Sequence, residues 1–427
     1  MIDERTLEKE ALAEIGRRGI AETLSYVGSN SRYYQRVFKE LHARPEDFSD
    51  LDAFRQFPLT TKQDVSGSIR DFWCVEEQRV VDISTTSGTT GHPTLYPMTY
   101  GDIERLGVNE YLSFRCAGLT EHDTVILAVT MDRCFMAGLA YYEGLTRIGA
   151  TTIRVGSGPY GMLLDFLERV RPTAIVSVPS YLRKIGLYAQ ENGLDLASSP
   201  VNRLICIGEP IREPNFSLNP LGQQIEQLWG ARVYSTYGIT ELAISFCECD
   251  AAGGGHLHPE LIYAEIVDEK GHPVPEGEIG ELVGTTIGVQ AMPIVRFATG
   301  DCSFIQRERC ACGRWTPRLG PIVGRKRHLM KIKGTSVYPA AVQRVLDSLP
   351  QVREYVMVVR SVAALSDELT VMVALQGEAN TGADLVRQHL QAALKVTPVV
   401  KVVSMEEIER LQDIQHLRKK RVFIDER

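Results

Sequence analysis

The sequence predicts an α/β protein in which a large amino-terminal domain is followed by a small α+β domain. Three observations predict this fold class. Between about residues 80 and 240, short apolar runs alternate with helical patterns, which is typical of a largely parallel sheet. From 260 to 323 glycines become frequent, and short alternating runs indicate antiparallel strands. After Gly324 the pattern reads strand, loop, helix, strand, strand, helix and strand over roughly 100 residues, the size of a small domain.

The individual elements follow from local patterns. Apolar residues recur at near-helical spacing over 6–44, with Gly19 as an expected interruption, and 58–64 predict a turn followed by a capped helix start. In the first domain, strands are expected at 80–84, 124–130, 151–155, 173–179, 203–208, 231–238, 261–268 and 280–286, and helices at 138–149 and 162–170. In the second domain, helices are expected at 340–349 and 383–394, and strands at 355–361, 369–375 and 399–404.

Composition and charge exclude several classes of protein. Apolar residues make up 44% and charged residues 24% of the 427 residues, which excludes collagen, coiled coils and wholesale disorder. The net charge of −7 argues against a generic nucleic-acid or membrane surface. The charged first residues do not resemble a signal peptide, and no apolar run approaches the ~20 residues of a membrane span. Nine cysteines are an odd number in a long chain, so we expect a reducing cytoplasm in which they are thiols, catalytic groups or metal ligands rather than disulfides.

A loop rich in glycine and hydroxyl side chains follows the first predicted strand. Residues 85–93 read TTSGTTGHP, so the backbone can approach an anion closely and the hydroxyl groups add donors. The ending of a Walker A loop is missing. From this segment alone, a triphosphate cradle and a solvated loop are equally acceptable interpretations.

The segment from Ser87 to Gly91, with Pro93, resembles the signature of adenylate-forming enzymes, which include the acyl-CoA synthetases. Many members carry Lys at the position of Thr94, and a threonine there is typical of the phenylacetate–CoA ligase branch. Further segments similar to that branch lie at 58–62, 135–150, 178–181, 208–210, 237–241, 299–301 and 334–339. The resemblance covers about 55–405. It implies an adenylate-forming domain of mixed sheets and helices over 1–323 and a mobile cap over 324–427, with the hinge between Val323 and His328.

The resemblance also implies a reaction. A carboxylate attacks the α-phosphorus of ATP, and the thiol of coenzyme A then displaces AMP from the acyl-adenylate. Because two anions must meet, catalysis would rest on positioning and charge neutralisation. An apolar pocket would suit an aryl or arylalkyl acid such as phenylacetate. The alternatives are transfer to a carrier-protein phosphopantetheine arm or to an amine, and a non-catalytic nucleotide-binding protein. A homodimer is a further option.

The same resemblance assigns roles to individual residues. ATP binding falls to Thr86, Ser87, Gly88, Thr89, Thr90, Gly91, Gly208, Glu209, Pro210, Tyr237, Gly238 and Asp301. Catalytic roles fall to Thr240, Glu241, Arg325 and Lys419, with Glu241 also binding Mg²⁺. Acid binding falls to Phe135, Gly138, Leu139 and Tyr234, and CoA binding to Gly334. Some of these residues have a purely structural alternative: an Asx turn for Asp301, a helix N-terminal charge for Glu241, and core packing for the acid-pocket candidates.

Two departures from the family pattern are visible. Where the family usually carries two aspartates near the hinge, this chain has Arg327 and His328, which would change how the small domain rotates. The family lysine that reaches the α-phosphate aligns with either Arg418 or Lys419. We prefer Lys419, because a guanidinium does not replace a slim ammonium. A solvated basic tail is an equally good account of this segment.

A set of cysteines and histidines suggests a metal. Cys-x-Cys pairs at 247–249 and 310–312 flank two histidines, and such groups are typical zinc ligands, although spacing alone also fits buried thiols. Many relatives carry a matching Glu-Cys, Gly-x-His and Cys-x-Cys-Gly pattern. The resemblance therefore selects Cys249, His256, Cys310 and Cys312 as ligands of a structural zinc ion. The reserve ligands, which would replace one of these four, are Cys247 and His258 and, less favoured, Cys302.

Overall fold

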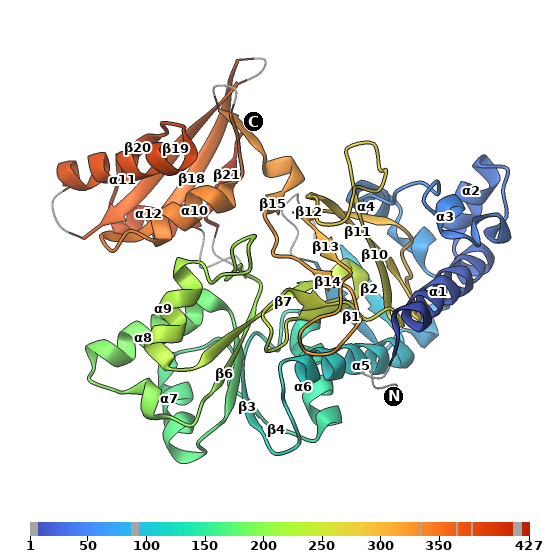
Figure 1. Cartoon of the computed structure of the whole chain (residues 1–427), viewed down its shortest axis with the longest axis horizontal. Coiled ribbons are helices and arrows are strands. Elements are labelled where there is room, and N and C mark those ends of the chain that lie inside the picture. The colour runs from blue at the N-terminus through green and yellow to red at the C-terminus, as the bar shows by residue number, and fades with distance from the viewer. Residues whose placement is uncertain (1–6, 87–93, 333–334, 364–365, 377–378, 413–420) are drawn as a thin grey trace. The chain divides into compact units, whose positions relative to one another are not determined.

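The computed structural model describes residues 7–86, 94–332, 335–363, 366–376, 379–412 and 421–427 (Figure 1). The chain divides into two compact units. The first contains 1–218, 222–299 and 303–321, and the second contains 219–221, 300–302 and 322–427.

The first unit begins with helices, as predicted, but the expected break at Gly19 is wrong. Helix α1 runs without interruption over Lys9–Asn30 and is followed by α2 (Arg32–Glu40). A Cβ added at Gly19 would lie 2.7 Å from the Ile287 side chain, so the glycine allows close packing of the helix rather than ending it. The next helices are η1 (Pro45–Phe48), α3 (Leu51–Phe54), α4 (Lys62–Gly67), η2 (Ile69–Phe72) and η3 (Glu77–Arg79).

A six-stranded sheet in the order β4-β3-β5-β6-β7-β8 forms the centre of the first unit. Its strands are β3 (Thr124–Ala128), β4 (Thr151–Arg154), β5 (Ala174–Ser177), β6 (Arg203–Ile207), β7 (Arg232–Ile239) and β8 (Ile244–Cys247). All neighbours are parallel except β7 and β8. The predicted parallel sheet is therefore confirmed, with one antiparallel edge strand.

Helices cover both faces of this sheet. They are α5 (Tyr100–Cys116), α6 (Met136–Ile148), α7 (Tyr160–Arg169), α8 (Pro179–Glu191) and α9 (Pro220–Trp229), with the short η4 (Leu196–Ser198). The chain steps from β3 outward to β4 through α6, then returns through α7, α8 and α9 toward β7. Right-handed crossovers in opposite directions put α6 on the other face from α7–α9, as Figure 1 shows. The strand order thus reverses between β3 and β5.

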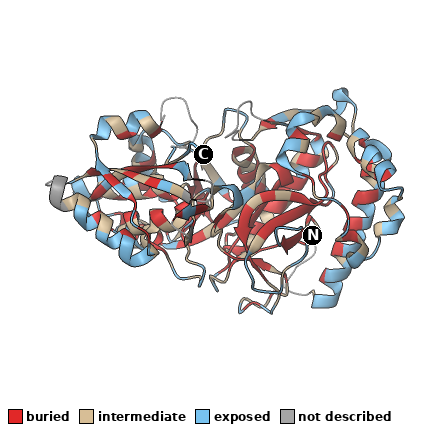
Figure 2. Ribbon diagram, turned by 90° about the horizontal axis from the view of Figure 1, so that it is seen from above, coloured by how far each residue is buried: buried red, intermediate tan, exposed pale blue. Residues whose placement is uncertain are grey.

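The core of the sheet consists of apolar side chains from β3, β5, β6, α5 and α6. This cluster includes Phe114, Leu127, Tyr141, Val176 and Ile205, all of them buried. Figure 2 shows buried residues along the strands and exposed residues on the outer sides of the helices. The packing holds the carboxyl ends of the parallel strands in fixed positions relative to one another.

Three smaller sheets complete the first unit. They are a ribbon of β1 (Asp82–Thr85) and β2 (Leu95–Met98), a sheet of β10 (Ile262–Val267), β11 (Gly280–Thr286) and β12 (Phe297–Ser303), and a sheet of β9 (Gly255–His256), β14 (Arg318–Leu319) and β13 (Ile305–Gln306). Residues 300–302 of β12 belong to the second unit. The antiparallel pairing of β10 with β11 confirms the prediction for the glycine-rich region. The three short strands β9, β13 and β14 bring 255–256 and 305–319 together.

The second unit is an α+β fold. It contains β15 (Gly324–Arg325), η6 (Lys326–His328), β16 (Met330–Ile332), β17 (Thr335–Val337), α10 (Pro339–Asp347), β18 (Val352–Ala363), β19 (Ser366–Leu375), α11 (Ala379–Leu394), β20 (Val399–Val402), α12 (Met405–Gln412) and β21 (Phe423–Asp425). Its main sheet has the order β20-β19-β18-β21, and separate apolar clusters cover its two faces. The predicted helices and strands of this domain are all present.

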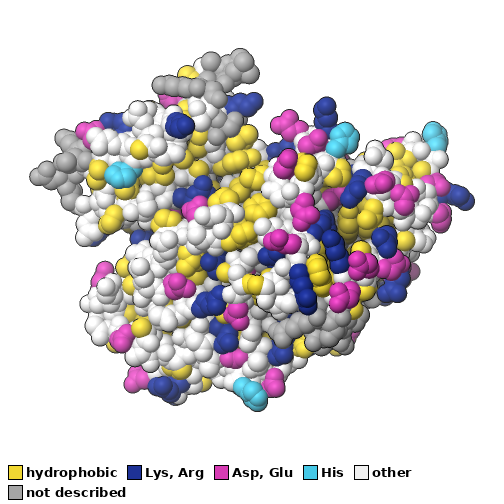
Figure 3. Space-filling view, in the orientation of Figure 1, with side chains coloured by type: hydrophobic (Ala, Val, Ile, Leu, Met, Phe, Trp, Pro, Cys, Tyr) yellow, Lys and Arg dark blue, Asp and Glu magenta, His cyan; other side chains and the backbone are white. Residues whose placement is uncertain are grey.

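The surface carries charges of both signs. On the face in Figure 3, basic and acidic side chains are interspersed across the described residues of each unit. In the described part of the chain, no helix combines the length and the apolar composition that crossing a bilayer requires.

Candidate active site and metal centre

Three of the predicted site segments follow the carboxyl ends of parallel strands in the first unit. Phe135 follows β3, Glu209 follows β6, and Thr240 follows β7. Carboxyl ends of parallel strands meet at one edge of a sheet, and ligands of open α/β sheets bind there, where the strand order reverses. That reversal lies between β3 and β5, so the loops after these two strands border the expected crevice.

The ends of the predicted phosphate loop lie beside the loop after β3. The loop residues Ser87, Gly88, Thr89, Thr90 and Gly91 lie outside the described residues. Its base is closed by Thr86 and Thr94, since the Thr86 N–H donates to the Thr94 carbonyl at 3.1 Å. The Thr85 N–H donates to the Cys134 carbonyl at 2.9 Å. This bond places the base of the loop one residue from Phe135.

Glu241 lies in a short 3₁₀ turn, η5 (Thr240–Leu242), and is only 9% exposed. Its carboxylate forms an ion pair with Lys62, with Nζ 3.3 Å from Oε1. Lys62 is the first residue of α4, whose start is fixed by a capping box between Thr61 and Asp64. The segment 58–62 was part of the family pattern, but pattern reasoning assigned no partner to Lys62, because the two residues are far apart in sequence.

A buried arginine holds the turn that carries Glu241 in place. Ala243 ends the turn with φ +48°, and its carbonyl accepts a 2.7 Å hydrogen bond from the buried guanidinium of Arg105. The same guanidinium donates to the carbonyls of Ile287 and Leu261. Burial lowers the pKa of Arg105 to about 10, so it stays charged at neutral pH. Arg105 therefore fixes the backbone directly after Glu241.

The segment after β6 is held by its glutamate. Gly208 has φ +76°, a conformation that favours glycine, and it turns the chain away from the strand. The Glu209 carboxylate accepts hydrogen bonds from the Ser180 N–H and hydroxyl, both at 2.8 Å. Glu209 is thus bound to the start of α8, and Pro210 follows it in the same segment. Ser180 lies in the VPSY segment of the family pattern, where no role had been predicted for it.

Tyr237 and Gly238 lie near the carboxyl end of β7. The Tyr237 ring stacks against Phe246 of β8, with centroids 6.1 Å apart and an interplanar angle of 21°. Gly238 is exposed, and a Cβ there would meet no protein atom closer than 3.5 Å. Packing within the protein therefore does not require the glycine.

The four acid-pocket candidates have different surroundings. Phe135 and Leu139 are partly buried, at the start of α6 and in its first turn. A Cβ on Gly138 would lie 2.3 Å from the Thr130 carbonyl oxygen, so this glycine is needed for packing. Tyr234 is 2% exposed in the core of the sheet, and its hydroxyl donates to Asp250 at 2.6 Å.

In the second unit, Asp301 and Arg325 are brought together. They pair across the antiparallel contact of β12 with β15, and Nε of Arg325 donates to Oδ1 of Asp301 at 3.1 Å. The Asp301 side chain is 12% exposed and that of Arg325 is 42% exposed. Two further predicted residues, Gly334 and Lys419, lie outside the described residues, as does Arg418.

The four predicted metal ligands converge. The ligand atoms of Cys249, His256, Cys310 and Cys312 all lie within 4.8 Å of one another. Sγ of Cys249 is 3.6 Å from Sγ of Cys310, and Sγ of Cys312 is 3.5 Å from Nε2 of His256. A tetrahedral zinc ion would separate two sulfurs by about 3.8 Å and a sulfur from a nitrogen by about 3.5 Å. The donor set and its spacing therefore fit zinc.

Residues around the cluster orient its ligands. Nδ1 of His256 lies 2.7 Å from the Thr316 hydroxyl, which leaves Nε2 facing the cysteines. Arg314 donates to Sγ of Cys312 at 3.4 Å. Hydrogen bonds from the Cys249 and Cys310 thiols lower the pKa of Cys312, and the contacts with Cys310 and Cys312 raise the pKa of Cys249. These contacts therefore favour a thiolate at Cys312 rather than at Cys249.

The reserve ligands lie elsewhere. Cys247 accepts a hydrogen bond from Thr236 and packs into the core of the main sheet. His258 lies 3.5 Å from the Ser113 hydroxyl, and Cys302 accepts a hydrogen bond from Tyr338 in the second unit. Among the described residues, none of the three belongs to the cluster.

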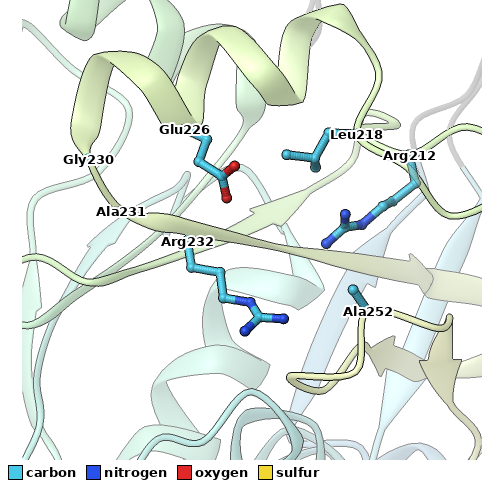
Figure 4. Close-up of a pocket in the computed structure, with 7 residues that line it drawn as sticks. All are labelled: Arg212, Leu218, Glu226, Gly230, Ala231, Arg232 and Ala252. Atoms are coloured by element: carbon cyan, nitrogen blue, oxygen red, sulfur yellow. The ribbon is translucent and has the colours of Figure 1, made fainter.

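A cavity of about 570 Å³ lies at a different place, beside the start of β7 and the end of α9 (Figure 4). Its lining consists of Arg212, Leu218, Glu226, Gly230, Ala231, Arg232 and Ala252. It is open, and Arg232 there is already paired with Asp250. Because Gly230 and Ala231 precede β7, this cavity is not at the carboxyl edge that carries Glu241.

The sequence matches two models of protein families. The model of AMP-binding enzymes matches residues 39–291, and that of the AMP-binding enzyme C-terminal domain matches residues 334–427. The chain is 29% identical over 379 residues to the phenylacetate-coenzyme A ligase of Thermus thermophilus, covering 86% of this chain and 83% of the relative. It is 28% identical over 344 residues to that of Escherichia coli, covering 79% and 76%.

Solved structures of similar fold include 2-hydroxyisobutyryl-CoA ligase. In its postadenylation state with 2-HIB-AMP, that enzyme gives a TM-score of 0.86 at 22% identity, covering 100% of this chain and 95% of the other. In its thioesterification state with 2-HIB-AMP and CoA, it gives 0.71 at 24% identity, covering 98% and 90%. These likenesses establish the fold.

Proposed function

Since the chain belongs to the family of AMP-binding enzymes, we propose that it joins a carboxylic acid to coenzyme A at the expense of ATP. The carboxylate attacks the α-phosphorus of ATP and releases pyrophosphate. The CoA thiol then attacks the acyl-adenylate, forms a thioester and releases AMP. The observation that carries this proposal is the family match over 39–291, together with the named CoA ligases that align with as much as 86% of the chain.

The adenylation step needs charge neutralisation, because a carboxylate must approach a polyphosphate. We assign Glu241 to Mg²⁺, a hard cation that prefers oxygen ligands and that would neutralise phosphate charge when bound. Thr240, directly before it, faces the α-phosphate in this proposal. Lys62 adds a positive charge within 3.3 Å of the same carboxylate. By resemblance, Ser87 to Gly91 hold the β- and γ-phosphates and Lys419 reaches the α-phosphate.

Nucleotide recognition falls to the segments after β6 and β7. Gly208, Pro210 and Tyr237 form the adenine pocket in this proposal. Gly238 is open on its exposed side, and the missing side chain leaves room for the nucleotide. Asp301, an acceptor-only carboxylate, binds the ribose hydroxyl groups, and its ion pair with Arg325 keeps the arginine beside them.

The acid pocket lies beside the strand-order reversal in this proposal. Phe135 and Leu139 are only partly buried there, so we rest the pocket on these two side chains. Gly138 and Tyr234 support its walls through packing. An aromatic wall and relatives named phenylacetate-coenzyme A ligases favour an aryl or arylalkyl acid. By resemblance, Gly334 contacts CoA.

We assign a structural zinc ion to Cys249, His256, Cys310 and Cys312. All four positions of a tetrahedral site are filled by the protein, which leaves no position for a substrate. The ion would fix the 247–258 segment to the 302–314 loop. The nine cysteines, which all lie within the described residues, form no disulfide bond there, which suits a reducing cytoplasm. The site is tested by measuring the zinc content of the protein after dialysis against a weak chelator. Protein that holds no zinc, and whose thermal stability is the same with and without a chelator, would contradict the assignment.

The function is tested in two assays with a panel of aromatic and aliphatic acids. We expect acid-dependent pyrophosphate release, followed by CoA-dependent AMP release. Glu241→Gln should abolish the first signal, whereas Glu265→Gln, at a buried ion pair whose two residues belong to none of the assigned site segments, should retain it. Pyrophosphate release without CoA-dependent AMP release would favour a carrier protein or an amine as acceptor. Absence of both signals with every acid would favour a non-catalytic binding protein. Sedimentation measurements decide between monomer and dimer.

A further inference from the structure

Glu248 lies between the core of the sheet and the proposed zinc site. It directly precedes the ligand Cys249, and its backbone forms a bridge with Gly255, the neighbour of the ligand His256. Its carboxylate is 1% exposed and accepts a 2.8 Å hydrogen bond from the Ser235 N–H of β7. Glu248 is therefore held on one side by β7 and on the other by the segment that carries the ligand His256.

The partner of Glu248 is Arg212. The guanidinium donates Nη2 to Oε1 at 2.6 Å and Nε to Oε2 at 3.1 Å, a two-pronged geometry in a site where Arg212 is 9% exposed. Arg212 also donates to the carbonyls of Phe216 and Val233. A buried carboxylate and guanidinium that bind each other in this way leave little room for alternative arrangements, because separating them leaves both charges unpaired.

Arg212 is two residues beyond Pro210, so it ends the segment 208–212, whose first three residues we assign to the adenine pocket. That segment is held at two points. Near its start, Glu209 is bound to Ser180 at the beginning of α8, and at its end Arg212 is bound to Glu248 beside the zinc ligands. If the 248–256 segment shifts, the second anchor of the adenine segment is lost while the first one is kept.

We propose that the Glu248–Arg212 pair couples zinc binding to nucleotide binding, so that each ligand raises the affinity of the protein for the other. The inference rests on the proposed function, because it takes 208–210 as part of the nucleotide pocket and Cys249 as a metal ligand. Glu248 and Arg212 are positioning residues, since neither is assigned a contact with ATP or with the metal. Coupling between two binding sites is reciprocal, so both affinities must change by the same factor.

The test measures ATP binding by calorimetry without any acid, on zinc-loaded and zinc-stripped wild-type protein. We expect zinc to strengthen ATP binding by about 5-fold to 150-fold, the usual range of such coupling. Equilibrium competition with a chelator, with and without saturating ATP, should give the same factor for zinc. If stripping unfolds the wild type, as circular dichroism would show, the competition measurement on the loaded protein decides.

The variant Glu248→Gln keeps the shape of the side chain and removes its charge. In the zinc-loaded state it should weaken ATP binding several-fold, and it should bring the reciprocal factor in the chelator competition close to one. The matched control is Glu265→Gln, which breaks the Arg296–Glu265 pair, of similar burial and length, in the same unit. We expect the control to lose stability and to keep both the ATP affinity and the coupling factor.

Three results would overturn the inference. The first is an unchanged coupling factor in Glu248→Gln, and the second is a loss of coupling in Glu265→Gln as large as that in Glu248→Gln. The third is a wild-type protein in which neither measurement detects an effect of zinc on ATP affinity or of ATP on zinc affinity. These differ from a failure of the proposed function. A wild-type protein that does not bind ATP at all refutes the nucleotide site itself, whereas tight ATP binding that is independent of zinc refutes only the coupling.

Discussion

Glu110 is a buried carboxyl group whose protonation should govern the stability of the first unit. It lies in α5, is 3% exposed, and contacts α6 at Gly144, where an added Cβ would lie 2.3 Å from the Glu110 Cβ. Burial raises the pKa of Glu110 to about 8, and a hydrogen bond with Ser245 and the nearby His258 oppose the shift only partly. The folded protein therefore keeps a proton that the unfolded chain releases above pH 4.5.

The sign and size of the effect follow from this difference. Because the folded-state pKa is raised, the stability from Glu110 is fully present below pH 4.5 and is lost as the pH rises through about 8. Within that window each pH unit changes the free energy of unfolding by about 1.4 kcal/mol. Between pH 5.5 and 7.5, Glu110 should thus lower the free energy of unfolding of the wild type by about 2.7 kcal/mol. The variant Glu110→Gln, which has no ionisable group at this position, should not show this loss.

Urea unfolding at the two pH values provides the assay. The tryptophans, Trp73, Trp229 and Trp315, all lie in the first unit, so their fluorescence reports its unfolding. The control is Glu104→Gln, an exposed position on the same helix, which should follow the wild type at both pH values. If Glu110→Gln and the wild type differ by the same free energy at pH 5.5 and 7.5, Glu110 is ionised in the folded state and the reasoning is refuted.

Three further predictions concern single contacts. Thr316→Val removes the hydrogen bond to Nδ1 of His256 and should weaken zinc binding about 10-fold to 100-fold in chelator competition; unchanged affinity would mean that Thr316 does not orient the ligand. Gly138→Ala should lower the free energy of unfolding by about 1–3 kcal/mol, because the new methyl group overlaps the Thr130 carbonyl; a rise in the urea midpoint would contradict this. Arg427→Ala removes two 2.9 Å bonds to the carbonyls of residues 327 and 329, so amide exchange should accelerate around 327–329 and stay constant in α11.

Much of the fold could be predicted because it depends on local patterns. Alternation of apolar runs with helical periodicity identified the strands and helices of both units, and the capped start of α4 was visible in Thr61 and Asp64. The error at Gly19 has a tertiary cause. A glycine lowers helix propensity by about 1 kcal/mol, but in this helix it allows contact with Ile287, more than 250 positions away.

From the sequence, the chemistry of the site could be predicted only as a set of motif residues in a fixed order along the chain. The motifs that contain Glu209, Thr240 and Glu241 are short and local, so they can be recognised without a structure. Their partners cannot, since Lys62 and Ser180 reach those carboxylates through contacts between distant segments. The spacing of these residues along the chain does not indicate which pairs of side chains will be in contact.

The sequence by itself determined the α/β class, the family pattern and the set of cysteines and histidines that suits zinc. Only the tertiary structure decided which of them converge. Cys247 and Cys249 are two positions apart, yet one packs into the sheet core and the other meets Cys310, because the chain leaves β8 between them. It also decided that Glu248 binds Arg212. The physical reason is that periodicity sets which way a side chain points along one element, whereas packing between elements sets what it meets.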